Sequence, residues 1–385
     1  MRDVLDELIS VWRAGGTAGV ATVVRTMRSA PRQPGAAMVV APDGTVAGSV
    51  SGGCVEAAVY ELATEVVRTG RPQLHRYGIS DEDAFAVGLT CGGIIDVFAE
   101  PLSQSTFPLL GAVADDITAH RPTAVATVIA HPEPEWVGRR LVVGETSADG
   151  SLGSARSDDA VADDARGLLA AGRTAVLTYG PDGQRQGTGM EVFVASHAPR
   201  PRMIVFGAID FAAALTRQAA LLGYRVTVCD ARPVFATAAR FPAADEVVVD
   251  WPHRYLAAQQ AQGAIDSRTA ICLLTHDPKF DVPLLEVALR LPRVGYLGAM
   301  GSRPTHEDRL DRLRELGLTE AELSRLASPI GLDLGARTPE ETAVSIAAEI
   351  IARKWGGGGR PLADVDGRIH HDATDHASLT AGDMR

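Results

Sequence analysis

Two cysteines in the first hundred residues lie beside glycines, in segments where a thiolate can reach a ligand. Cys91 lies between Thr90 and the pair Gly92-Gly93, and Cys54 follows the pair Gly52-Gly53. Glycine permits a positive φ and the close approach of a ligand to the backbone. A thiolate is a soft ligand that suits a thiophilic metal, although a small buried thiol in a tight turn would have the same neighbours. We predict that Cys91 binds a ligand and is a candidate metal ligand, and leave Cys54 evenly balanced between binding and packing.

The other cysteines and the C-terminal histidines favour structural or solvent-exposed roles. Cys229 and Cys272 lie in the apolar segments TVCD and AICLL, which is typical of core positions. The sequence has no C-x-x-C motif and no histidine or cysteine cluster with zinc or iron–sulfur spacing. A polar tail explains the last histidines better than a metal site does: His370, His371 and His376.

A glycine turn at Gly207 departs from the fingerprint of dinucleotide-binding proteins. The fingerprint G-x-G-x-x-G/A needs its second glycine so that pyrophosphate can approach the backbone, and this chain has Ile209 there. Asp210 then places a carboxylate at the start of the expected helix, where it can cap the helix and repel phosphate. Asp230 has the position of a ribose-binding acid, but without the glycine it is better interpreted as a cap or loop anchor. We therefore expect poor binding of NAD(P).

A weak internal repeat positions the two glycine–cysteine segments. Five short matches run in register, among them Ala21-Thr22-Val23 with Ala126-Thr127-Val128. Each unit is predicted to fold as strand, strand, helix, strand, strand. The helix start at 51–56 is thereby matched to 155–160, which has neither the glycine pair nor the cysteine. We infer that these residues are dispensable to the fold and that the chemistry lies in the first unit.

From residue 202 the sequence alternates between apolar strands and amphipathic helices. Such alternation predicts a parallel, doubly wound sheet, in which ligands bind in the loops at the carboxyl ends of the strands. The fold class is therefore α/β, with an N-terminal α+β domain of two weakly repeated units followed by a Rossmann-like, doubly wound domain. The expected boundaries are 1–200 (units at about 18–100 and 123–195), 201–355, and a glycine-rich linker with a polar tail at 356–385.

Length, composition and charge limit the class of protein. The chain has 385 residues, 46% hydrophobic and 22% charged, which is typical of globular proteins and too long for one core of roughly 250–300 residues. No apolar run reaches the length of about 18 residues that a membrane span needs, and acidic residues interrupt the N-terminal segment where a signal peptide would lie. A net charge of −11 argues against a nucleic-acid partner. We expect a cytoplasmic protein.

Several long segments together resemble the XdhC/CoxI family. They are TVVRTMRSAPRQPGAAMVV, GSVSGGCVEAAV, YGISDEDAFAVGLTCGGIIDVFAEPL, YLGAMGSR and PIGLDLGARTPEETAVSIAAEI, in the order and spacing of that family. The resemblance implies a chaperone of the molybdenum cofactor (molybdopterin), an accessory factor of xanthine dehydrogenase- or CO dehydrogenase-type molybdenum hydroxylases. Such proteins bind the cofactor, assist its sulfuration with a cysteine desulfurase, and deliver it to the hydroxylase.

The resemblance also implies roles for single residues. In the family, the position of Cys91 is associated with binding the cofactor. Glu56 either caps its helix or meets a pterin ring nitrogen, and Arg32 suits the cofactor's phosphate, although a solvated loop explains that arginine as well. The predicted cofactor-binding residues are Cys91, Gly92, Gly93, Cys54, Gly52, Gly53, Glu56, Arg32, Gly298, Gly301, Ser302 and Arg303.

Two classes of function remain open at this point. The first is a cofactor chaperone without turnover and without catalytic residues, working as a homodimer with a xanthine dehydrogenase-type hydroxylase and a cysteine desulfurase. The second is an NAD(P)-dependent oxidoreductase built on the C-terminal domain, with Cys91 as a redox thiol. Ile209 and Asp210 count against the second class. A third and weaker option is a protein that has lost its ligand and only docks a partner enzyme.

Overall fold

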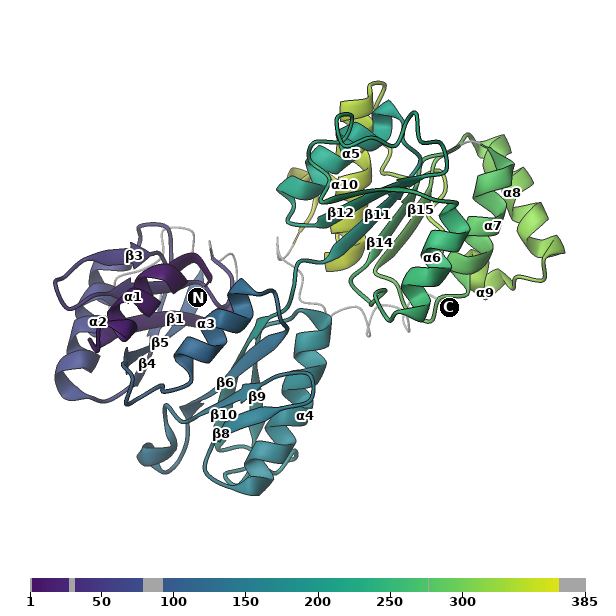
Figure 1. Ribbon diagram of the computed structural model, residues 1–385. Helices are drawn as coiled ribbons and strands as arrows, with labels where there is room; N and C mark the ends of the chain where they lie inside the picture. The colour runs from purple at the N-terminus through teal and green to yellow at the C-terminus, as the bar shows by residue number, and fades with distance from the viewer. Residues whose placement is uncertain (1, 28–31, 79–92, 276, 367–385) are drawn as a thin grey trace. The chain divides into compact units, whose positions relative to one another are not determined.

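The fold comes from a computed structural model in which residues 2–27, 32–78, 93–275 and 277–366 are described. They form two compact units that divide between Pro199 and Arg200 (Figure 1). No helix in these ranges is both long enough and apolar enough to cross a bilayer.

The first unit contains two five-stranded antiparallel sheets with the same strand order. The first sheet is β3-β2-β1-β5-β4 and the second is β8-β7-β6-β10-β9. We call the two segments the first repeat (18–102) and the second repeat (123–197). The strands of the first are β1 (Ala18–Met27), β2 (Ala37–Val40), β3 (Val46–Gly48), β4 (Gln73–Tyr77) and β5 (Ile94–Leu102). Those of the second are β6 (Thr123–Ala130), β7 (Arg140–Val143), β8 (Ala148–Ser151), β9 (Ala175–Tyr179) and β10 (Met190–His197).

One long helix covers one face of each sheet. Side chains alternate between the two faces of a strand, so neighbouring residues of one strand pack against different helices. In β1, Ala21 and Val23 face α2 (Glu56–Thr69), while Val20 faces α1 (Leu5–Arg13) and α3 (Leu110–Thr118). The second sheet packs against α4 (Ala155–Ala171) in the same way. A small apolar cluster joins the sheets on their other faces, formed by Val24, Phe98, Ile129, Phe193 and Ala195.

Matching hydrogen bonds align the repeats more closely than sequence identity does. The hydroxyl of Ser49 donates to Glu56, and that of Ser151 donates to Asp158 in the same way. Glu56 therefore corresponds to Asp158, and Cys54 to Arg156, at a constant separation of 102 residues. The predicted match of 51–56 with 155–160 is therefore wrong by two residues. Short glycine–serine pairs recur by chance near both helix starts, and they misled the sequence alignment.

The second unit is a five-stranded parallel sheet in the order β13-β12-β11-β14-β15. This confirms the predicted fold class. Its strands are β11 (Arg202–Phe206), β12 (Arg225–Asp230), β13 (Glu246–Val249), β14 (Ala270–Leu273) and β15 (Tyr296–Ala299). Helices α5 (Asp210–Leu221) and α10 (Pro339–Trp355) cover one face. The other face packs against α6 (Pro252–Ala261), α7 (Pro278–Leu289), α8 (Arg303–Glu315) and the short α9 (Glu320–Leu323) (Figure 1). The described residues also form the 3-10 helices η1 (Arg2–Val4), η2 (Pro134–Trp136) and η3 (Leu362–Asp364).

Candidate functional site

The predicted site is only partly within the described residues. Cys91 and Gly92 lie outside them. Gly93 is described and buried, just before β5. Its carbonyl oxygen lies 3.1 Å from the position that a Cβ at Gly78 would take, so β4 and β5 approach closely where the intervening loop begins and ends.

The segment before α2 wraps around the carboxylate of Glu56. We call residues 49–55 the Ser49–Val55 loop. Glu56 accepts hydrogen bonds from six donors in this loop, at 2.6–3.2 Å. The donors are the hydroxyls of Ser49 and Ser51 and the backbone N–H groups of Ser51, Gly52, Gly53 and Val55. Both carboxylate oxygens are thus occupied by donors that precede α2, so Glu56 organises the loop before its helix and does not cap the helix as one of its two expected roles required.

The hydrogen bonds keep Glu56 ionised. Burial opposes ionisation, but the hydroxyls of Ser51 and Ser49 and the loop N–H groups outweigh it and lower the pKa of Glu56 to about 2. Donors that bond to the charged form favour that form. At neutral pH the loop is therefore organised around a fixed negative charge.

The glycine pair gives the loop its backbone shape. Gly52 has φ +78° and Gly53 has φ +121°, conformations that side chains rarely adopt. Among the described residues, no atom lies within 4 Å of the place where a Cβ would stand at either position. Cys54 follows them half-buried, with its N–H donating to the Ser51 hydroxyl at 3.0 Å and its side chain packed against the core beneath α2.

The predicted arginine is held by an acidic partner. Arg32 lies 2.8 Å from the carboxylate of Asp3, in η1. Arg25, near the end of β1, is paired with Asp96 at 3.5 Å and with Glu191 of the second repeat at 2.8 Å. Arg25 therefore joins the two repeats, in a role that the sequence did not predict. Phosphate binding by Arg32 remains a prediction, and a bound phosphate would have to compete with Asp3 for the Arg32 guanidinium.

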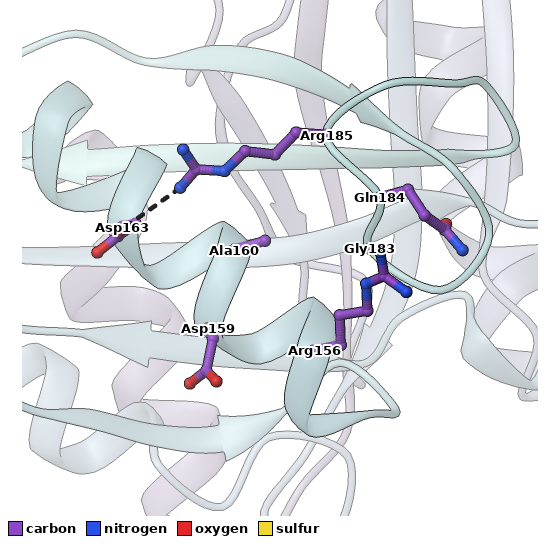
Figure 2. Close-up of a pocket in the computed structure, with 7 residues that line it drawn as sticks. All are labelled: Arg156, Asp159, Ala160, Asp163, Gly183, Gln184 and Arg185. Atoms are coloured by element: carbon purple, nitrogen blue, oxygen red, sulfur yellow. Dashed lines mark hydrogen bonds and ion pairs between the residues drawn. The ribbon is translucent and has the colours of Figure 1, made fainter.

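The second repeat has a shallow pocket near the corresponding place. Arg156, the counterpart of Cys54, lines it from α4, and Arg185 lines it from the loop between β9 and β10 (Figure 2). The pocket has a volume of about 700 Å³, and the Arg185 guanidinium lies 3.2 Å from Asp163. Its lining has two arginines and two aspartates, so their formal charges cancel.

In the second unit the glycine turn after β11 is closed by the protein's own groups. The N–H of Ala208 donates to the buried Asp230 carboxylate at 2.7 Å. Burial opposes ionisation of Asp230, but hydrogen bonds from Arg232 and Ala208 outweigh it and lower the pKa of Asp230. Asp210 is paired with Arg240 at 3.3 Å. Asp230 is thus the loop anchor that its sequence context suggested.

The predicted loop after β15 divides between packing and surface. Gly298 lies in β15, where a Cβ would come within 2.6 Å of the Ile330 side chain. The hydroxyl of Ser302 accepts the N–H of Thr305 at 3.3 Å and caps α8. Arg303 is exposed at the first position of that helix, and Gly301 has φ +156°.

Beneath this loop lies a buried ion pair that the sequence did not predict. The Arg309 guanidinium lies 2.9 Å from the Asp281 carboxylate and donates to the Met300 carbonyl at 2.9 Å. It thereby ties the end of β15 to α7. In the described ranges, no group of three or more histidine, cysteine or acidic side chains is arranged to hold a metal ion.

Comparison with known proteins agrees with this architecture. The XdhC Rossmann domain profile matches residues 203–350, and the XdhC and CoxI family profile matches residues 11–78 and 117–180. A protein of Bacillus subtilis (strain 168), described as a probable subunit of xanthine dehydrogenase, is 31% identical over 334 residues, covering 86% of this chain and 92% of that one.

Two further relatives extend over most of the chain. The molybdenum cofactor insertion chaperone PaoD of Escherichia coli (strain K12) is 29% identical over 351 residues, covering 91% of this chain and 88% of that protein. The crystal structure of a xanthine dehydrogenase from Bacillus halodurans superposes with a TM-score of 0.64 at 25% identity, over 94% of this chain and 97% of that one. The chain belongs to the XdhC and CoxI family, as its sequence segments predicted.

Proposed function

We propose that this protein binds the molybdenum cofactor as cargo and helps to insert it into a molybdenum hydroxylase of the xanthine dehydrogenase type. The likeness to PaoD, named as a molybdenum cofactor insertion chaperone and aligned over 91% of this chain, carries the proposal. The cofactor supplies the chemistry of the hydroxylase, and this chain's residues hold and release it.

The Ser49–Val55 loop supports this role on physical grounds. It brings a half-buried thiol, Cys54, next to two glycines that no described side chain crowds. The thiolates of Cys54 and Cys91 would hold the metal side of the cofactor, since a thiolate is a soft ligand that suits a thiophilic metal. Gly93, Arg32 and the loop from Gly298 to Arg303 remain predicted contributors to the same binding.

Anaerobic loading tests the proposal directly. The purified chain is mixed with free molybdenum cofactor, passed through gel filtration, and assayed for molybdenum and oxidised pterin in the protein peak. We expect about one equivalent in the wild type. Cys91→Ala should lose the cofactor with an unchanged melting temperature, and Cys54→Ala should lose less. Comigration of neither molybdenum nor pterin with the wild type would refute the proposal and favour a protein that only docks its partner.

The proposed role requires partners and a compartment that supplies them. We propose contacts with the recipient hydroxylase and with a cysteine desulfurase, a homodimeric state, and a cytoplasmic location. Co-purification with tagged hydroxylase and desulfurase tests the first two, light scattering tests the third, and fractionation tests the last.

The second unit is proposed to have no nicotinamide function. The N–H of Ala208 is already bonded to Asp230, and the Asp210 carboxylate is largely exposed at the start of α5, where pyrophosphate would approach. Calorimetric titration with NAD or NADP should show no binding tighter than about 1 mM, or ~4 kcal/mol. A micromolar dissociation constant would revive the oxidoreductase alternative.

A further inference from the structure

We infer that Glu56 is a positioning residue: its carboxylate keeps Gly53–Val55 out of helix α2 and thereby sets where the Cys54 thiol stands. The inference rests on the proposed function for its consequence, but its geometry stands on contacts within the chain. It assigns Glu56 to the support of the thiol rather than to contact with the cofactor.

The second repeat shows what this segment does when the carboxylate belongs to a shorter side chain. Glu56 is the first residue of α2, whereas its counterpart Asp158 is the fourth residue of α4. The counterparts of Gly53–Val55 are residues 155–157, and these are helical. The two helices end at equivalent glycines, Gly70 and Gly172, both in the left-handed conformation. The difference is therefore confined to the start of the helix.

Side-chain length explains why the two starts differ. Asp158 accepts hydrogen bonds from the Ser151 hydroxyl at 2.8 Å and the Leu152 N–H at 2.6 Å. Glu56 has one more methylene and accepts from the corresponding serine and from four loop N–H groups. A helix start at Gly53 would need different φ values at the glycines and would break these bonds. In α4 the first turn is instead closed by a capping box between Ser154 and Ser157.

The position of Cys54 follows from this arrangement. If α2 began where α4 begins, Cys54 would be its second residue, and its side chain would take the direction that Arg156 takes into the pocket of Figure 2. Instead the Cys54 N–H bonds to Ser51, which itself donates to Glu56 at 2.6 Å. Glu56 thus fixes the backbone of Cys54, and with it the thiol, through two hydrogen bonds that meet at the Ser51 hydroxyl.

Thiol labelling of the apo chain measures the position of Cys54 without any cofactor. In a Cys91→Ala background, Cys229 and Cys272 are buried, so early alkylation reports Cys54 alone. Glu56→Gln removes the charge and replaces one acceptor oxygen with an NH2 donor, so the loop should open. We expect the alkylation rate constant of Cys54 to rise at least about threefold, because reactivity follows thiol exposure. Glu56→Asp, the residue of the second repeat, should act in the same direction.

Matched controls separate positioning from general destabilisation. Asp158→Asn makes the same chemical change at the counterpart and should leave the Cys54 rate unchanged, with melting temperatures recorded for every variant. Should Glu56→Gln fail to fold, Ser49→Ala decides, since it removes one donor to the same carboxylate and should raise the rate by a smaller factor. Equal rates in the wild type and the folded variant, or an equal change in Asp158→Asn, would overturn the inference.

Cofactor retention then tests the functional consequence. With Cys91 intact, Glu56→Gln should lower the molybdenum content of the protein peak while Asp158→Asn keeps it. If the wild type retains no cofactor, the proposed function fails, whereas the labelling result stands by itself. If the wild type retains cofactor and Glu56→Gln retains as much, Glu56 does not act on binding through Cys54.

Discussion

The two repeats of the first unit share a strand order, but different kinds of interaction stabilise their connecting loops. In the second repeat the loops are fastened to each other by aromatic and polar side chains. Trp136 lies so close to Gly153 that a Cβ there would come within 2.5 Å of its ring. The His131 ring stacks on Trp136 at 4.4 Å, and its Nε2 lies 2.9 Å from the Pro181 carbonyl oxygen in the loop after β9.

The first repeat has no aromatic side chain at the corresponding position. The N–H of Ala36 donates to the backbone carbonyl of Gln33, and the N–H of Arg139 donates to that of Trp136 in the same way. Gln33 is therefore the counterpart of Trp136. Gln33 is exposed, and Gly52 and Gly53 have open space where side chains would stand among the described residues. The second repeat thus stabilises its loops with packed side chains, whereas the Ser49–Val55 loop of the first repeat is held by hydrogen bonds around one carboxylate and has no packed aromatic side chain among the described residues.

The largest expected effect concerns a buried ion pair between the two repeats. Arg140 in β7 forms a buried ion pair with Glu100 in β5, and its guanidinium lies over the Phe107 ring. Removing one partner of a buried pair leaves an uncompensated charge and costs about 3–5 kcal/mol. Arg140→Ala should therefore lower the free energy of unfolding by that amount in denaturant titrations, with both repeats unfolding together. Two separate transitions would show that the repeats are independent.

The same pair gives this prediction a pH dependence. Burial outweighs the attraction of Arg140 and raises the pKa of Glu100. A carboxyl with a raised pKa in the folded state becomes less destabilising as the pH falls and it takes up a proton. The deficit of Arg140→Ala should thus be largest near pH 7 and shrink toward the unfolded-state pKa of about 4.3. A deficit that stays constant or grows on acidification would contradict this.

A pair of glycine substitutions tests the difference between the loops. Gly153→Ala must accept φ +137° and press a methyl group against Trp136, so we expect a loss of about 2–4 kcal/mol. Gly52→Ala must accept only φ +78° with open space around it, so about 1 kcal/mol is expected. Thermal unfolding of the two variants compares them. Equal losses would mean that the first loop is packed as tightly as the second.

The buried cysteines provide a smaller contrast with Cys54. Cys229 and Cys272 are fully buried in β12 and β14, and burial raises the pKa of Cys229 to about 12. We expect each alanine variant to lose about 1–2 kcal/mol of stability. Neither thiol should react with an alkylating reagent on the timescale of Cys54. Fast labelling of the native wild type at either position, by mass spectrometry, would contradict their burial.

An acid titration isolates the contribution of the Glu56 carboxylate. Because the pKa of Glu56 is lowered to about 2, its stabilisation is present above the unfolded-state pKa and is lost as pH falls through the folded-state value. The stability difference between the wild type and Glu56→Gln should be constant from pH 5 to 8 and shrink between about pH 4 and 2. A difference that persists undiminished at pH 2 would mean that the charge is not its cause.

Much of the fold could be predicted from local patterns. The alternation of strands and helices expected from residue 202 begins with β11, and α10 begins with a capping box in which the Glu341 N–H donates to the Thr338 hydroxyl at 3.2 Å. Both depend on residues close together in the chain. By contrast, α1 and α3 were not predicted, although their apolar sides pack on the first sheet.

The candidate site was less predictable because its contacts join distant or unlike residues. The Arg25–Glu191 pair and the Asp281–Arg309 pair each connect separate elements, and no local pattern marks them. The bonds of Ser49 with Glu56 and of Ser151 with Asp158 did leave a signal, since both pairs are seven residues apart. A search for that repeated spacing would have aligned the helix starts correctly.

The bond between Asp230 and the Ala208 N–H has a consequence for redesigning or diverging from this fold. A single exchange of Ile209 for glycine would leave the turn still sealed by a carboxylate from β12. Removing Asp230 first would leave Arg232 without its partner and a buried N–H without an acceptor, a defect that costs about 1–3 kcal/mol. Neither change alone would open the turn to a nucleotide. A route from this turn to a nucleotide-binding one would therefore need both changes and would pass through a variant of lower stability.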